Sequence, residues 1–317
     1  MTTPPRRSSK AVPAPRASRR SQKVVQVRPV VVSVGEILWD RFPKEAQLSG
    51  APANVAIHAA ALGAESWLVS AVGNDSFGNM AYNRLDAAGV HRATVPQLRG
   101  QVTGTVLMKP GAKGTLKYEF ADNVAWDHLS WSPQIEQVVK RAEALVFGTL
   151  AQRSQASRDT VRHAAGATPP RAWRLFDVNL RQNFFDSETI RTSLTLANAV
   201  KLNEFELPEV ARRCGVRGTT ESDILLGLCD KFALRLAVLT RGTRGALLRS
   251  HTLAVEVSAP AMPVVDPVGS GEAFTAALLL GLLEGLSLDQ AGTKACTLAA
   301  YVRSQERATP DIPPEYR

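Results

Sequence analysis

The chain alternates between short apolar runs rich in β-branched residues and longer segments of helical periodicity, starting at Val30. The strand-like runs span 30–34, 67–72, 144–147, 174–178, 199–202 and 236–239. The helical segments include 54–62, 77–88, 187–197 and 221–232. Because strands and helices in alternation build βαβ units, the sequence predicts an α/β fold with a mostly parallel sheet covered by helices.

Glycines and polar residues follow each strand-like run. In chain order these exits are Gly35-Glu36, Gly73-Asn74-Asp75, Gly148-Thr149, Asn179-Leu180-Arg181, Asn203-Glu204 and Thr240-Arg241-Gly242. Ligands of open parallel sheets bind outside the carboxyl ends of the strands. Any α/β protein needs some polar turns there, but six such exits favour a small-molecule site and an enzyme.

The basic charge is concentrated at the N-terminus. The whole chain carries a net charge of +9, whereas residues 1–28 hold eight basic residues and no acidic one. The rest is therefore nearly neutral. A segment of this composition cannot bury enough apolar surface to fold, so we expect a disordered basic tail over 1–28. It could tether a nucleic acid or an anionic surface, act as a transit-like segment, or have no dedicated role. We expect no nucleic-acid binding outside it.

Other partner and cofactor classes find little support. No apolar run reaches the ~18–20 residues that span a bilayer, so we expect no membrane segment. The three cysteines form no C-x-x-C pair, and the five histidines show no ligand spacing. This pattern argues against disulfides and zinc and favours a reducing, cytoplasmic location. A homodimer is left open.

One glycine-rich turn stands out late in the chain. Neither G-x-x-x-x-G-K-[ST] nor a strand followed by G-x-G-x-x-G occurs, but Asp266-Pro-Val-Gly-Ser-Gly-Glu-Ala-Phe274 leads into the apolar run 276–283, which reads as a buried helix. A Gly-Ser-Gly turn at a helix start directs backbone N–H groups and the positive dipole end at one point, which suits an anion. Glu272 beside it could be a general base in phosphoryl transfer, or simply complement the helix dipole.

Several motifs in the same order resemble the ribokinase-like (PfkB) carbohydrate kinases, and in detail their bacterial fructokinase-type members. The late turn is similar to their Asp-Thr-x-Gly-Ala-Gly-Asp-x-Phe signature, and Ser49-Gly50-Ala51-Pro52-Ala53-Asn54 with Gly63 and Gly73 to their Gly-Gly-x-x-x-Asn element. Further resemblances lie in Gly35–Asp40, Val124–Asp127, Phe147–Ser154, Asp177–Gln182, Lys201–Glu204 and Leu239–Gly242. Together they extend from about Val30 to Pro313.

The resemblance implies a three-layer α/β/α kinase domain over 29–317 with a small β lid, inserted at roughly 36–48 and 99–121. It implies ATP and Mg²⁺ as cofactors and phosphorylation of a primary hydroxyl of a small sugar, with fructose the first candidate. The implied roles are catalysis by Glu272, Gly269, Ser270, Gly271 and Arg181; sugar binding by Asp40, Gly50, Asn54 and Asn179; nucleotide binding by Asn203, Thr240, Gly242 and Gly245; and a magnesium role for Glu206.

The chain itself supports the lid. Residues 103–108 and 115–120 alternate like strands, and the connection 109–114 is rich in proline and glycine, which predicts a β-hairpin. Such a hairpin either extends a sheet edge or forms a flap. We favour the flap because phosphoryl transfer needs a site closed against water.

Two residues depart from the family pattern. Ser49 replaces a glycine, which costs little if its φ is negative. Glu272 stands where family members carry a catalytic Asp, so its carboxylate is displaced by roughly 1 Å, and a misplacement of ~1 Å can cost ~10²-fold in rate. We therefore expect a slowed kinase. The alternative is a catalytically impaired regulatory protein that binds sugar or nucleotide on a kinase scaffold.

Overall fold

The computed structural model describes residues 1–3, 28–42, 45–110 and 116–317. The predicted tail falls almost entirely outside the described residues, as does most of the predicted hairpin turn. The structural statements below concern the described residues.

The predicted strand runs form one sheet. Its strand order is β14-β13-β12-β11-β10-β9-β1-β4. All neighbours from β12 to β4 are parallel, whereas β13 and β14 add an antiparallel edge. The bounds are β1 (Val30–Val34), β4 (Glu65–Val69), β9 (Ala144–Phe147), β10 (Trp173–Asp177), β11 (Ala199–Asn203), β12 (Leu236–Thr240), β13 (Ala246–Arg249) and β14 (Ala254–Val257).

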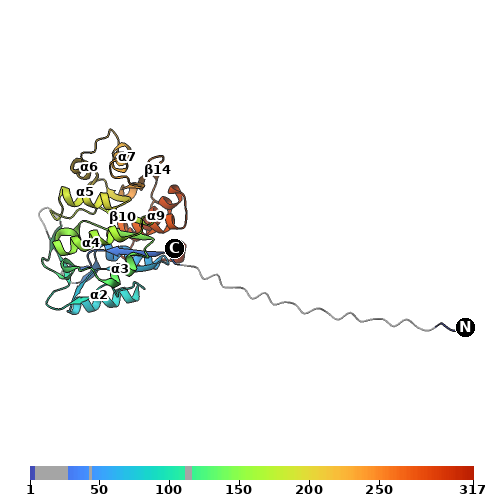
Figure 1. Cartoon of the computed structure of the whole chain (residues 1–317), viewed down its shortest axis with the longest axis horizontal. Coiled ribbons are helices and arrows are strands. Elements are labelled where there is room, and N and C mark those ends of the chain that lie inside the picture. Colours follow the sequence, from blue (N-terminus) through green and yellow to red (C-terminus); the bar gives the residue numbers. More distant parts are fainter. Residues whose placement is uncertain (4–27, 43–44, 111–115) are drawn as a thin grey trace.

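Helices cover both faces of this sheet (Figure 1). Val32 and Val34 of β1 pack into a core with one group of helices, whereas Val31 packs into a second core on the opposite face. The first group is α3 (Pro133–Val139), α4 (Gln155–Ala167), α5 (Ser187–Leu196), α6 (Leu207–Cys214) and α7 (Glu221–Phe232). The second is α1 (Ala51–Ala61), α8 (Ser270–Leu283) and α9 (Leu288–Arg303). The predicted three-layer α/β/α fold is therefore confirmed.

The apolar run after the glycine turn is helical, as predicted. Every residue of α8 from Ala273 to Gly281 is buried, because α8 packs against α1, α9 and the sheet. Its N-terminus is therefore held from three sides, which fixes where the first-turn N–H groups point.

A second, smaller sheet lies beside the main one. Its strand order is β3-β2-β7-β8, with β2 (Leu38–Arg41), β3 (Ala46–Ser49), β7 (Gly104–Pro110) and β8 (Leu116–Phe120). β7 and β8 are antiparallel, as the predicted hairpin requires, and β2 pairs with β7 in parallel. Trp39 of β2 anchors this sheet by donating its indole N–H to the Phe77 carbonyl oxygen of α2 (Ser76–Ala87) at 3.1 Å.

This small sheet also contacts the loop after β10. The Gln182 side chain donates to the carbonyl oxygen of Tyr118 in β8, and the rings of Phe120 and Phe184 meet edge to face at 5.6 Å. A third small element pairs β5 (Val72–Gly73) with β6 (Gln97–Leu98). The small sheet is thus tied to an exit of the main sheet.

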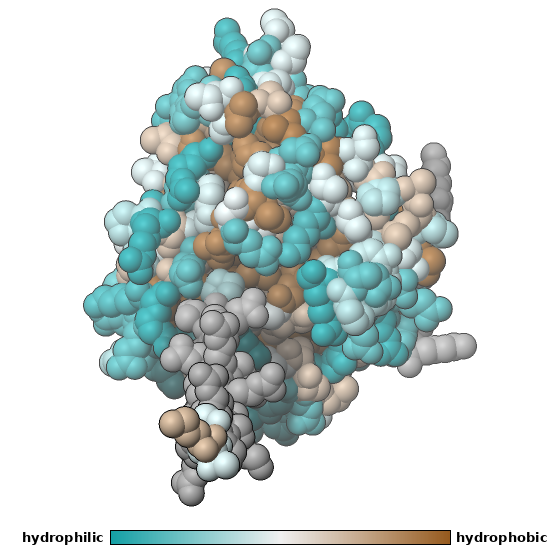
Figure 2. Space-filling model, turned by 90° about the vertical axis from the view of Figure 1, so that its right-hand side faces the viewer, coloured by the Kyte–Doolittle hydropathy of each residue, from teal (hydrophilic) through white to brown (hydrophobic). Residues whose placement is uncertain are grey.

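No helix in the described ranges is long and apolar enough to cross a membrane. Apolar side chains do reach the surface, as Figure 2 shows for the middle of one face. Val264 and Val265, just before the glycine turn, are 54% and 56% exposed. The polypeptide therefore approaches the N-terminus of α8 through a solvent-facing segment.

Candidate active site

The glycine turn is fixed by a neighbouring backbone. Gly269 is the N-cap of α8, has φ 81°, and makes no side-chain cap. A Cβ on it would lie 2.1 Å from the carbonyl oxygen of Ala308, so only glycine fits. No side chain caps this turn, but the Ser270 N–H lies 3.4 Å from the carbonyl oxygen of Pro267 in a long backbone hydrogen bond. The turn that the sequence predicts to bind an anion, Gly269, Ser270 and Gly271, thus starts α8 without a competing side chain.

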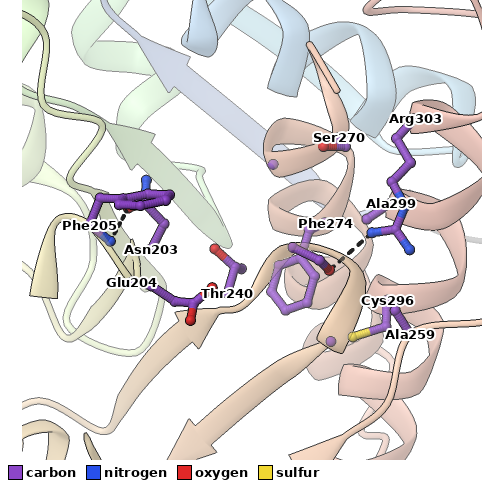
Figure 3. Close-up of a pocket in the computed structure, with 13 residues that line it drawn as sticks. Asn203, Glu204, Phe205, Thr240, Ala259, Ser270, Phe274, Cys296, Ala299 and Arg303 are labelled. Carbon is purple, nitrogen blue, oxygen red and sulfur yellow. Dashed lines mark hydrogen bonds between the residues drawn. The ribbon is translucent and has the colours of Figure 1, made fainter. Parts of the chain in front are cut away.

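A cavity of about 240 Å³ opens against this turn. Figure 3 shows Asn203, Phe205 and Thr240 on one side and residues of α8 and α9 on the other. All four residues predicted to bind the nucleotide line it together with two residues of the turn: Asn203, Thr240, Gly242, Gly245, Ser270 and Gly271. Sequence positions nearly seventy residues apart are thus brought to one cavity.

Two glycines that line this cavity, Gly242 and Gly245, have a positive φ. A Cβ on Gly245, where φ is 99°, would lie 1.9 Å from the carbonyl oxygen of Val257. Gly242, with φ 57°, accepts a hydrogen bond at its carbonyl oxygen from Nη1 of Arg303 at 3.0 Å. Arg303 is buried, lies in the last turn of α9, and brings a cation to the cavity that the sequence did not single out.

Glu272 lies in the first turn of α8, where the charges of Lys201, Asp177 and Arg181 act on it. The pKa of Glu272 is raised, chiefly by burial and also by the charge of Asp177, whereas Lys201 and Arg181 oppose this shift. Beneath the turn, Nζ of Lys201 lies 3.0 Å from both carboxylate oxygens of Asp177, and both side chains are buried. The acid thus faces two cations and at least one other carboxylate.

The substrate-binding prediction for Gly50 and Asn54 falls at the N-terminus of α1. Gly50 is the N-cap with φ 108°, and a Cβ there would lie 2.6 Å from the carbonyl oxygen of Glu36. Asn54 is buried, and its Oδ1 accepts no hydrogen bond from the described part of the chain. A buried acceptor without a donor is costly, and a ligand hydroxyl would satisfy it.

Glu36 connects this helix end to the glycine turn. Its side chain is buried, and burial raises its pKa to about 7, against the lowering effect of Arg181; Glu272 raises it further. The start of α1 lies against the Glu36 backbone, and α1 packs against α8, so Glu36 lies where the charges of Arg181 and Glu272 act on it. Glu36 is not among the site residues that the sequence predicts.

Asp40 approaches from the small sheet. The pKa of Asp40 is raised, chiefly by burial and also by the charge of Asp266. A hydrogen bond from the Ser49 hydroxyl and the charge of Arg181 oppose this shift. The charge of Arg181 thus acts on Asp40 as it does on Glu36 and Glu272. Ser49, which replaces the family glycine, lies in β3 and is not among the residues with positive φ, so the replacement is not strained.

The loop after β10 carries Asn179 and Arg181 in a fixed shape. Asn179 has φ 44°, a left-handed conformation that asparagine tolerates better than most residues. Glu206 braces this loop: its two carboxylate oxygens accept from the backbone N–H groups of Leu180 and Asn203, each at 2.9 Å. The exits of β10 and β11 are thereby tied together.

Comparison with known proteins decides the family. Residues 45–315 match the model of the pfkB family carbohydrate kinases. The chain belongs to this family.

Three relatives of this PfkB kinase cover most of its length. An uncharacterized sugar kinase of Pyrococcus horikoshii is 29% identical to this chain, and the alignment covers 90% of this chain and 93% of the relative. Its crystal structure superposes with a TM-score of 0.74 and covers 88% of this chain and 93% of that chain. That protein has also been solved in complex with ATP, at a TM-score of 0.70 over 86% and 91%. A fructokinase of Escherichia coli is 28% identical over 76% and 79%. A candidate ribokinase II of E. coli, in complex with ATP and Mg²⁺, is 22% identical with a TM-score of 0.76 over 89% and 94%.

One strand exit of the PfkB fold does not contribute to this site. Asp75 caps α2 by accepting from the Gly78 N–H at 2.7 Å, and its other oxygen accepts from the Thr103 N–H at 2.8 Å. The exit at 73–75 thus fastens α2 to the start of β7. Its polar residues serve the fold.

Magnesium has no ready-made protein cage. The described residues contain no cluster of three or more His, Cys, Asp or Glu that could hold a metal. Glu206 uses one lone pair on each oxygen for the backbone and keeps the others. Since Mg²⁺ is commonly held by one or two carboxylates, water and substrate phosphates, Glu206 fits such a role through its remaining lone pairs.

Proposed function

We propose that this chain transfers the terminal phosphoryl group of ATP, with Mg²⁺, to a primary hydroxyl of a small sugar, with fructose the first candidate. The observation that carries the proposal is the surroundings of the α8 turn. Ser270 and Gly271 line the cavity with Asn203 and Thr240, and the ammonium group of Lys201, whose charge acts on Glu272, lies under Gly271. Family membership and the sugar kinases among its relatives support this reaction.

On the nucleotide side, Asn203, Thr240, Gly242 and Gly245 would bind ATP in the cavity. The N–H groups at Gly269, Ser270 and Gly271 would face the terminal phosphate and stabilise the charge that develops on its oxygens. No side chain competes for these donors, and the Ser270 N–H would exchange its long, 3.4 Å bond to the Pro267 carbonyl oxygen for the phosphate. Mg²⁺, when bound, would neutralise phosphate charge, with Glu206 and the phosphates as its ligands.

On the sugar side, Asp40, Gly50, Asn54 and Asn179 would hold the sugar hydroxyls. Glu272 would accept the proton of the reacting hydroxyl as that oxygen attacks phosphorus and the bond to the leaving ADP oxygen breaks. Arg181, which faces Glu272, Asp40 and Glu36, would offset the charge of these carboxylates and of the transferred group.

The test is sugar-dependent release of ADP by purified protein over a panel of sugars, run beside Glu272→Asp and Glu272→Gln. We expect slow turnover by the natural protein, up to ~10²-fold faster turnover by Glu272→Asp, and a loss of ~10²–10⁴-fold in Glu272→Gln. Turnover by Glu272→Asp alone would instead favour the impaired, ligand-binding regulator. No sugar-dependent turnover by any of the three proteins would refute the kinase assignment.

We further propose that residues 29–317 form one kinase domain in the cytoplasm, with the small sheet as its lid. Contacts between β8 and the loop after β10 support the lid, because that loop carries Asn179 and Arg181. The three cysteines are free and buried, which suits a reducing compartment. The role of the basic tail and the formation of a homodimer are tested by deleting residues 1–28 and by measuring the mass in solution.

A further inference from the structure

We propose that Lys201 is a positioning residue for Glu272: the buried Lys201–Asp177 pair supports the first turn of α8 and places a cation under Gly271, the residue next to the acid. The inference rests on the proposed kinase function, because it concerns the group that would accept the proton. It assigns a role to two residues that the predicted catalytic and binding sets omit.

The pair is built into the centre of the sheet. Asp177 ends β10, Lys201 lies in β11, and the two residues are direct neighbours in the register of these parallel strands. Their side chains are 5% and 9% exposed. A buried ion pair contributes little to stability compared with apolar residues of similar size, since desolvation offsets the attraction. A buried ion pair at the centre of the sheet therefore calls for a role other than stability.

The pair reaches the glycine turn from two directions. Nζ of Lys201 would lie 3.2 Å from a Cβ on Gly271, so the ammonium group fills the space under that glycine. Oδ2 of Asp177 accepts from the hydroxyl of Thr275 at 3.2 Å. Thr275 is three residues after Glu272 and therefore lies on the same side of α8. Any side chain at position 271 would push the ammonium away from the turn.

The ammonium has capacity left for the acid. A lysine carries three donors, and the contacts of Nζ with Asp177 involve that carboxylate's two oxygens. Asp177, Glu272 and Glu206 all raise the pKa of Lys201 against its burial, so it stays protonated at neutral pH. A permanent positive charge thus lies beneath the first turn of α8.

The charge balance around Glu272 gives this cation its effect. The charges that act on Glu272 are those of Lys201 in β11, Asp177 in β10, Arg181 in the following loop and Glu36 at the β1 exit. Burial and the two carboxylates favour the protonated, inactive form of Glu272, and the two cations favour the ionised form. Without Lys201, a general base at this position would hold its proton at higher pH.

The experiment is a charge cycle of four proteins: wild type, Lys201→Gln, Asp177→Asn and the double variant. The readout is the acidic limb of the pH profile of kcat. Removing the cation is expected to move the limb to higher pH by about 1 pH unit, and removing the carboxylate to move it to lower pH. The acidic limb of the double variant must lie at a lower pH than that of Lys201→Gln and at a higher pH than that of Asp177→Asn. If one single variant does not fold, the comparison of the other with the double variant still has a predicted direction.

Two controls separate charge from packing. Lys201→Arg keeps the cation, and Thr275→Val removes an uncharged donor to Asp177, so neither should move the limb as far as Lys201→Gln does. Damage to packing alone would lower kcat in every variant without opposite shifts. Shifts of the same sign in the two single variants, or none, would overturn the role proposed for Lys201.

A second readout does not depend on turnover. In protein labelled with ¹³C at the glutamate carboxyl carbon, the resonance of Glu272 is identified by its loss in Glu272→Gln. Its titration should shift in the same opposite directions in the two single variants. If the resonance behaves in this way but no sugar is phosphorylated, the kinase proposal fails while the charge coupling stands. If sugar is phosphorylated but the resonance does not shift, the coupling fails alone.

Discussion

Two glycines at the ends of α8 offer a direct test of how tightly the proposed phosphate cradle is held. Gly269 precedes the helix with φ 81°, and Gly285 follows it with φ 80°. Their surroundings differ completely. A Cβ on Gly285 meets nothing within 4 Å, whereas a Cβ on Gly269 would lie 2.1 Å from the carbonyl oxygen of Ala308. Alanine at the two positions therefore has the same conformational cost and a different steric cost.

The magnitudes follow from these contacts. A left-handed conformation costs an L-residue about 1–2 kcal/mol, so Gly285→Ala should lower Tm by a few degrees and leave turnover unchanged. For Gly269→Ala, ordinary carbon contacts of about 3.5–4.0 Å require the helix start and Ala308 to separate by more than about 1 Å. Overpacking of this kind adds about 1–3 kcal/mol, and a displacement of ~1 Å in a catalytic turn costs ~10²-fold in rate.

The assay measures chemical denaturation and sugar-dependent ADP release for both variants and the wild type. Gly269→Ala should be less stable than Gly285→Ala and lose most of its kcat, even at temperatures where it is fully folded. Equal stability and equal turnover of the two variants would refute the claim that Ala308 holds the cradle. A large loss of turnover in Gly285→Ala would show that the effect does not come from the cradle.

Two buried groups predict pH-dependent stability of opposite sign. His58 is buried, with Nε2 3.0 Å from the Ala308 carbonyl oxygen, and burial lowers its pKa to about 4. The unfolded chain therefore takes up this proton at higher pH than the folded protein does. The stability of the wild type relative to His58→Gln should rise as the pH rises from about 4 to 6.5. Burial raises the pKa of Glu36 to about 7, so the folded state binds this proton first, and wild-type stability relative to Glu36→Gln should fall as pH rises from about 4.5 to 7. Urea denaturation between pH 4.5 and 8 measures both differences, and flat curves or slopes of equal sign would contradict the assigned burial.

The main sheet could be predicted because its central strands are buried on both faces and read as continuous apolar runs. The run at 67–72 shows the limit of this signal. In the structure β4 ends at Val69, opposite the last residue of β1, and a separate short strand starts at Val72. The apolar pattern continues through both elements, whereas the pairing partner changes. Strand ends that depend on a partner are invisible in one sequence.

The site was predicted where its residues are consecutive and missed where they are not. The glycine turn and the exits at 179–181, 203 and 240–245 carry local signals, because glycines and polar groups interrupt an apolar pattern. Arg303 lies at the end of a helix and reaches the cavity only through the fold. Lys201 and Asp177 did leave a signal, since each is a charge inside or at the end of a buried parallel strand. Their charges are opposite, but only the pairing register of β10 and β11 shows that the two residues are neighbours.

The backbone around position 272 leaves little room for a side chain longer than aspartate. The turn before Glu272 has no room to move toward Ala308, because Gly269 is packed against that residue. It also has little room to move toward β11, because the Lys201 ammonium group lies under Gly271. The backbone is therefore poorly able to absorb the extra methylene of glutamate, and the displacement falls on the side chain and on the sugar that meets it. For this reason Glu272→Asp changes reach with little change in charge or backbone, and its effect on kcat measures the misplacement of the carboxylate itself.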